Sequence, residues 1–181
     1  MLSVVRPGGR ASERFEETLA YALEKHCFSV TTCLPAPIEN RRLLFAVPLN
    51  ESGINSAYYQ LLAFLRTHPG SLKGCVGGVL VDGPGDLYTK SLGRELALAA
   101  SLAGCTFPGR PLVEATGDLR NFTVQAKNAG CSLEKAYRLA AADLVDRVCT
   151  FAPPRHKRPR LLVLHASSRA TSNTLALWGQ V

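Results

Sequence analysis

Apolar and polar positions alternate along the chain with two periods, one typical of buried strands and the other of amphipathic helices. Five strands are predicted from short apolar runs, at residues 2–6, 28–34, 42–48, 74–82 and 111–116. The run at 42–48 is almost entirely apolar, as expected for a parallel strand that helices cover on both faces.

Between these runs, apolar residues recur at spacings of three and four, which predicts helices. Ser12 is expected to cap the first helix, whose buried face runs from Phe15 to His26, and a second stripe runs from Ile54 to Leu65. Three further helices are expected at about 89–103, 119–128 and 132–149. Strands that alternate with helices form βαβ units. The pattern therefore predicts a three-layer α/β fold, a flavodoxin-like doubly wound parallel five-stranded sheet of order 2-1-3-4-5.

The predicted fold also indicates where a ligand would bind. In open α/β sheets, pockets lie beyond the carboxyl ends of the strands, at the point where the strand order reverses. The loops that follow the strands at 2–6, 42–48 and 74–82 are therefore expected to form the site.

The pattern restarts after a change of composition near residue 150. We expect a flavodoxin-like domain at 1–150, a Pro/Arg-rich basic linker at 151–160, and at 161–181 the first strand and phosphate-loop start of a second flavodoxin-like domain. A strand, a turn and under two helical turns cannot bury a core alone. The last segment is therefore expected to dock on the first domain, to pair with another chain, or to begin a domain that truncation has removed.

Charge and composition narrow the class of protein. Of the 181 residues, 46% are hydrophobic and 19% are charged, which allows a core and argues against disorder. The formal net charge is +7, and four basic residues lie together within 155–160. Because no aromatic residue interrupts that patch, we expect a solvated linker and not a nucleic-acid site.

The sequence also bears on compartment and on cysteine chemistry. No apolar run approaches the roughly 18–20 residues that span a bilayer, and no secretory signal is recognisable, so no membrane association and a cytoplasmic location are expected. The six cysteines form no Cys-x-x-Cys pair. We expect them to be buried, reduced thiols.

The segment Ala166–Thr174 carries the most specific chemistry. It follows the apolar run at 161–165 and is rich in Ser, Thr and Asn, with one arginine. Hydroxyls, an amide and backbone N–H groups at a helix N-terminus bind anions. The alternative is an ordinary helix cap rich in Ser and Thr.

This segment resembles the FMN-phosphate loop of the NADPH-dependent FMN reductase family, whose pattern is Gly-Ser-x-Arg-x-x-Ser-Asn-Thr. Ala166 replaces the glycine. The resemblance implies phosphate contacts for the five matching residues, which are Ser167, Arg169, Ser172, Asn173 and Thr174.

A similar loop follows the first predicted strand. Gly9, Arg10 and Ser12 fit the pattern, whereas Glu13 and Arg14 stand where Asn and Thr are expected. The resemblance implies cofactor binding for the three matching residues. Glu13 is expected to lie near the phosphate and to repel it.

Two more loops carry a weaker resemblance to the family. Pro48 matches a proline at the end of the third strand, and Asn50 takes the position of a tyrosine. Gly83 and Gly85 resemble the loop that lies along the flavin edge, although a simple turn is the alternative. Three tyrosines are candidates for stacking on a ring, with core or interface packing as the alternative, at positions 58, 59 and 88.

The sequence shows no acid–base constellation, no nucleophile elbow and no Walker-type phosphate loop, so no catalytic side chain is assigned. This fits a flavoprotein, in which the flavin carries the hydride chemistry. The resemblance implies an FMN-binding oxidoreductase with NAD(P)H as co-substrate, in a homo-oligomer. The alternative is a degenerate, non-catalytic flavodoxin-like domain that serves dimerisation or interdomain packing.

Overall fold

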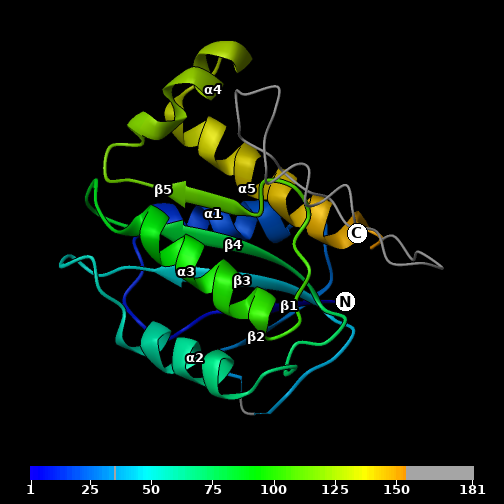
Figure 1. Ribbon diagram of the computed structural model, residues 1–181. Helices are drawn as coiled ribbons and strands as arrows, with labels where there is room; N and C mark the ends of the chain where they lie inside the picture. The colour runs from blue at the N-terminus through cyan, green and yellow to red at the C-terminus, as the bar shows by residue number, and fades with distance from the viewer. Residues whose placement is uncertain (35, 154–181) are drawn as a thin grey trace, which may run out of the picture.

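Five parallel strands form the central sheet. The computed structural model describes residues 1–34 and 36–153, and the statements below refer to these ranges (Figure 1). The strands are β1 (Leu2–Val5), β2 (Phe28–Thr31), β3 (Arg42–Pro48), β4 (Val76–Asp82) and β5 (Leu112–Ala115). Their order is β2-β1-β3-β4-β5, and every neighbouring pair is parallel. The predicted fold is confirmed.

Helices cover both faces of the sheet. They are α1 (Glu13–Leu23), α2 (Ser56–Thr67), α3 (Thr89–Leu102), the 3₁₀ turn η1 (Arg120–Phe122), α4 (Thr123–Ala129) and α5 (Leu133–Thr150). Figure 1 shows α1 and α5 together on one face and α2 and α3 on the other. None of the helices in the described ranges combines the length and apolar character that a membrane crossing requires.

Successive side chains of the central strands point to opposite faces of the sheet and pack into two separate hydrophobic cores. On β3, Leu44 packs under α1 and α5, and Phe45 packs under α2 and α3. Gly78 on β4 lets α5 approach closely, because a Cβ there would lie 2.8 Å from Val148 and 2.9 Å from Leu144. Both faces of the central strands are apolar because helices cover the sheet on both sides.

Helix ends account for two differences from the sequence prediction. Ser12 caps α1 as expected, but the helix ends at Leu23. His26 therefore lies beyond it and pairs with Asp146, at 2.9 Å between Nε2 and Oδ1. Asn55 caps α2, so Ile54 precedes the helix and is 47% exposed instead of joining its buried stripe.

Element boundaries differ from the prediction where the backbone turns. β4 begins at Val76 and not at residue 74, because Gly74 has a φ of +73°, which no strand residue adopts. The helix predicted at 119–128 divides into η1 and α4 after Leu119, which has a φ of +58°. β2 ends at Thr31, whose hydroxyl donates to the carbonyl of Cys33 and begins a turn.

The cysteines follow the sheet topology. Cys75 and Cys105 are buried as expected, whereas Cys27 and Cys33 are exposed. These two flank β2, which lies at the edge of the sheet and is exposed along most of its length. The expectation of burial was therefore wrong for both, because an edge strand has a neighbour on one side only.

Candidate functional site

A cavity opens at the carboxyl edge of the sheet. β1 lies between β2 and β3, so the strand order reverses where the loops after β1 and β3 diverge. The cavity has a volume of about 780 Å³. Its wall consists of residues 10–14, residues 49–52, Asp82, Pro84 and Gly117. Loops after β1, β3, β4 and β5 therefore meet around one space.

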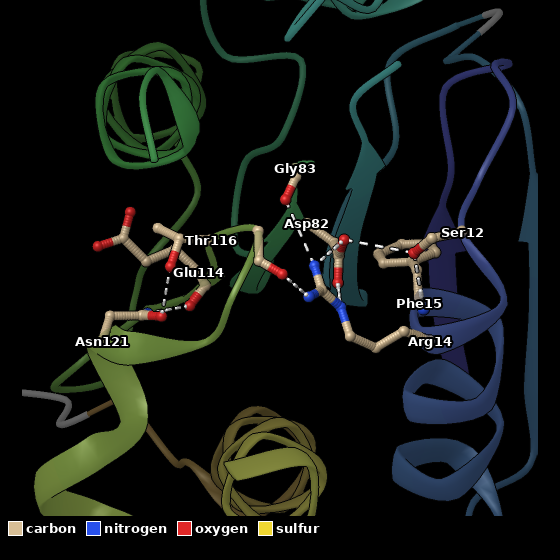
Figure 2. A network of polar contacts seen from close by, with 9 residues as sticks. Ser12, Arg14, Phe15, Asp82, Gly83, Glu114, Thr116 and Asn121 are labelled. Carbon is tan, nitrogen blue, oxygen red and sulfur yellow. Dashed lines mark hydrogen bonds and ion pairs between the residues drawn. The ribbon is translucent and has the colours of Figure 1, made fainter. Parts of the chain in front are cut away.

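The ion pair between Arg14 and Asp82 crosses this edge of the sheet (Figure 2). Arg14 donates from Nη2 to Oδ1 at 2.7 Å and from Nε to Oδ2 at 3.1 Å, and the Asp82 carboxylate is buried. The same guanidinium donates to the carbonyl oxygens of Gly117 at 2.8 Å and Gly83 at 3.3 Å. A single side chain thus joins α1, the end of β4 and the segment after β5.

The start of α1 has its own hydrogen bonds. The hydroxyl of Ser12 accepts from the backbone N–H of Phe15 at 3.2 Å and donates to Asp82 at 3.4 Å. The first turn contains Glu13 and Glu16. Carboxylates at a helix N-terminus offset the positive end of the helix dipole. This terminus is therefore already stabilised by the protein's own acidic groups.

Tyr137 on α5 lies in the core near Asp82. Its side chain is buried, and its hydroxyl has no hydrogen-bond partner within the described ranges. Burial raises the pKa of Tyr137 well above its ordinary value, and the nearby negative charge of Asp82 raises it further. The phenol therefore stays neutral in the folded protein.

The loop after β3 is fixed by two asparagines. The Oδ1 atom of Asn50 accepts from the backbone N–H groups of Ser52 at 3.0 Å and Ile54 at 2.9 Å. The amide of Asn55 donates to the carbonyl of Pro48 at 2.8 Å. The side-chain oxygen of Asn50, which lines the cavity, thus accepts its hydrogen bonds from within its own loop.

The loop after β4 is packed closely at Gly83 and ends in an exposed aromatic residue. A Cβ at Gly83 would lie 2.8 Å from Thr89, so a larger residue would displace the start of α3. Tyr88 is 60% exposed and has a φ of +74°, which is unusual for a bulky residue. Its ring lies against Gly53, beside the loop segment that lines the cavity. Such strained backbone concentrates at functional sites.

The structure places the residues singled out in the sequence in two groups. Three of them line the cavity: Arg10, Ser12 and Asn50. Four others lie near it without lining it: Gly9, Gly83 and Gly85 in the loops, and Pro48 at the end of β3. The five tail residues lie outside the described residues: Ser167, Arg169, Ser172, Asn173 and Thr174.

Sequence reasoning missed the Arg14–Asp82 pair, together with Leu49 and Glu51 in the cavity wall. A signal for Asp82 was present, because it is an acid at the end of an otherwise apolar strand. In the described part of the chain, no cluster of three or more His, Cys, Asp or Glu side chains is arranged to hold a metal ion.

Comparisons with known proteins agree with this architecture. No protein-family model and no curated protein sequence matches the chain. Among solved structures, it is similar to a flavodoxin of Streptococcus pneumonia TIGR4, with 10% identity and a TM-score of 0.52, over 81% of this chain and 98% of that one. It is also similar to a short-chain flavodoxin associated with a non-canonical PDU bacterial microcompartment, with 16% identity and a TM-score of 0.52, over 82% and 99% of the two chains. At these identities the similarity establishes the fold, which is flavodoxin-like.

Proposed function

We propose that this chain is an FMN-binding, NAD(P)H-dependent oxidoreductase of the FMN reductase type, with the flavin in the cavity at the carboxyl edge. The observation that carries the proposal is the position of that cavity, where loops from β1, β3 and β4 meet at the reversal of strand order. Open α/β sheets bind ligands at this point. The volume of about 780 Å³ lies in the usual range for small-molecule sites.

The ring end of a flavin fits the residues present. Leu49 and Pro84 give the wall apolar surface, and the exposed ring of Tyr88 lies beside the loop that carries Leu49. A flat heteroaromatic ring needs apolar faces of this kind. When bound, the flavin supplies the hydride chemistry, and the chain's part is to bind and orient it.

The phosphate end of FMN does not fit the first loop. Glu13 lines the cavity where the family's pattern has asparagine, and Arg14 is held by Asp82. We therefore assign no step to a phosphate at α1. We also propose that the tail motif Ala166–Thr174 binds a phosphate at the start of a second flavodoxin-like domain, which begins at residue 161 after the linker at 151–160.

A specific observation favours a second candidate, a non-catalytic domain used for dimerisation or interdomain packing. The Arg14–Asp82 network joins three elements through the protein's own groups and so engages the arginine that a phosphate would otherwise contact. Oligomeric state and a cytoplasmic location stay predictions under either candidate.

A flavin titration distinguishes the two candidates. The purified chain is titrated with FMN and followed by quenching of flavin fluorescence, beside Tyr88→Asn and the control Tyr59→Asn, which removes an exposed tyrosine from α2. Asn tolerates the positive φ at position 88, so the first variant removes the ring without adding strain.

Saturable binding that Tyr88→Asn weakens and Tyr59→Asn leaves unchanged supports a flavin in the cavity. Loss of the flavin's visible absorption on addition of NADPH or NADH then supports the reductase activity. A complete lack of binding contradicts the proposal and favours the non-catalytic domain.

A further inference from the structure

The charges around the cavity oppose a phosphate. Two cations, Arg10 and Arg14, line it together with three carboxylates, Glu13, Glu51 and Asp82. Arg14 and Asp82 neutralise one another through a bidentate pair. Arg10, Glu13 and Glu51 are all exposed, and none has an ion-pair partner among the described residues. The charges left to meet a ligand are therefore one cation and two carboxylates.

Two of the backbone N–H groups at the start of α1 are already bonded within the protein. Ser12 already accepts from the N–H of Phe15 through its hydroxyl and from the N–H of Glu16 through its carbonyl. Glu13 lies on the first turn, where a phosphate would have to bind. A dianionic group at this terminus would meet a carboxylate of its own sign, in a place where the helix dipole is already offset.

Neutral polar ligand groups suit the same surface. Ionised carboxylates only accept hydrogen bonds. A neutral hydroxyl group can donate to them without the electrostatic repulsion that an anionic group would meet. Glu13 comes from the first turn of α1 and Glu51 from the loop after β3, and both line the cavity. The wall thus combines apolar surface at Leu49 and Pro84 with exposed carboxylate acceptors.

We propose that the cavity recognises a flavin by its ring and its polyhydroxylated side chain and does not recognise the phosphate, so that it binds riboflavin about as tightly as FMN. This inference rests on the proposed function. It assigns to Glu13 and Glu51 the hydrogen bonds that the ligand's hydroxyl groups donate, and to Glu13 a repulsion that offsets the attraction between a phosphate and Arg10.

The test compares two ligands that differ only in the phosphate. Riboflavin and FMN are titrated in parallel into the chain at low ionic strength, with flavin fluorescence as the readout. The chain carries Ser172→Ala and Asn173→Ala, so that the tail motif does not contribute a phosphate site. The two Kd values are expected to agree within about fivefold, since one exposed charge near a helix end changes binding by a factor of roughly two to five.

A charge variant tests the role of Glu13. Glu13→Gln is expected to tighten FMN by roughly two- to fivefold and to leave riboflavin nearly unchanged, because it removes a like charge from the first turn of α1. Glu24→Gln is the matched control, with the same change of charge at the exposed far end of α1, and it should alter neither Kd.

Each outcome decides a different claim. FMN that binds more than about fivefold tighter than riboflavin, or a Glu13→Gln variant that leaves the FMN Kd unchanged, overturns the inference and leaves the proposed function standing. Failure of both ligands to bind overturns the proposed function and the inference together.

Discussion

Removing the Arg14 guanidinium should leave Asp82 as a buried carboxylate without a counterion. The Arg14 side chain is 23% exposed and that of Asp82 is 4% exposed, so the carboxylate is buried and the guanidinium partly buried. Breaking a buried pair by removing one partner costs roughly 3–5 kcal/mol. Because Arg14 keeps some solvent contact and Ser12 still donates to Asp82, we expect Arg14→Gln to cost about 3 kcal/mol, the lower end of that range. Urea denaturation followed by circular dichroism measures this loss.

The matched control is Arg66→Gln, which removes an ion pair with Glu95 in which the side chains are 57% and 39% exposed. Such a surface pair contributes about 0–1 kcal/mol. Asp82→Asn should cost less than Arg14→Gln, because the guanidinium keeps its bonds to two carbonyl oxygens. Equal losses for Arg14→Gln and Arg66→Gln would refute the view that the pair holds α1 to β4.

Three further predictions concern burial. Cys27 is exposed and should react with a maleimide in the native protein. Cys105 should not react, because burial raises the pKa of its thiol to about 12. Mass spectrometry of the labelled peptides checks both expectations. The raised pKa values of Cys105 and Tyr137 favour the protonated, folded state. The free energy of unfolding should therefore stay constant up to about pH 8.5. From there toward about pH 12 it should fall by up to about 1.4 kcal/mol per pH unit for each group. Urea denaturation at a series of pH values measures this change. Gly78→Ala should destabilise the folded protein by roughly 1–3 kcal/mol, because the added methyl group overpacks the contact with α5. Gly109→Ala is the control and should change the stability little, because a Cβ there meets nothing within 4 Å. Thermal unfolding compares the two variants.

Local patterns were enough to predict the fold. The almost continuous apolar run of β3 indicated a strand covered on both faces, and Leu44 and Phe45 do enter opposite cores. Ser12 caps the helix that follows it, as its position and chemistry indicated. These features depend on neighbours in the sequence, which is why the sequence reveals them.

The site depended on contacts that local patterns do not contain. Arg14 and Asp82 lie 68 positions apart and meet only because parallel strands bring their carboxyl ends to one edge. The sequence marked Arg14 only as a departure from a phosphate-loop pattern. The positive φ of Tyr88 and the exposure of Cys27 likewise arise from packing around a loop and an edge strand.

The central claim is that the cavity at the carboxyl edge binds a flavin. The most direct test maps the amide signals of the ¹⁵N-labelled chain by NMR while FMN is added. A flavin in the cavity should shift the signals of residues 10–14, residues 49–52 and Asp82, which line it, and should cause little change around Leu112 at the start of β5. Shifts absent from all of these cavity residues, or confined to residues outside them, would contradict the claim.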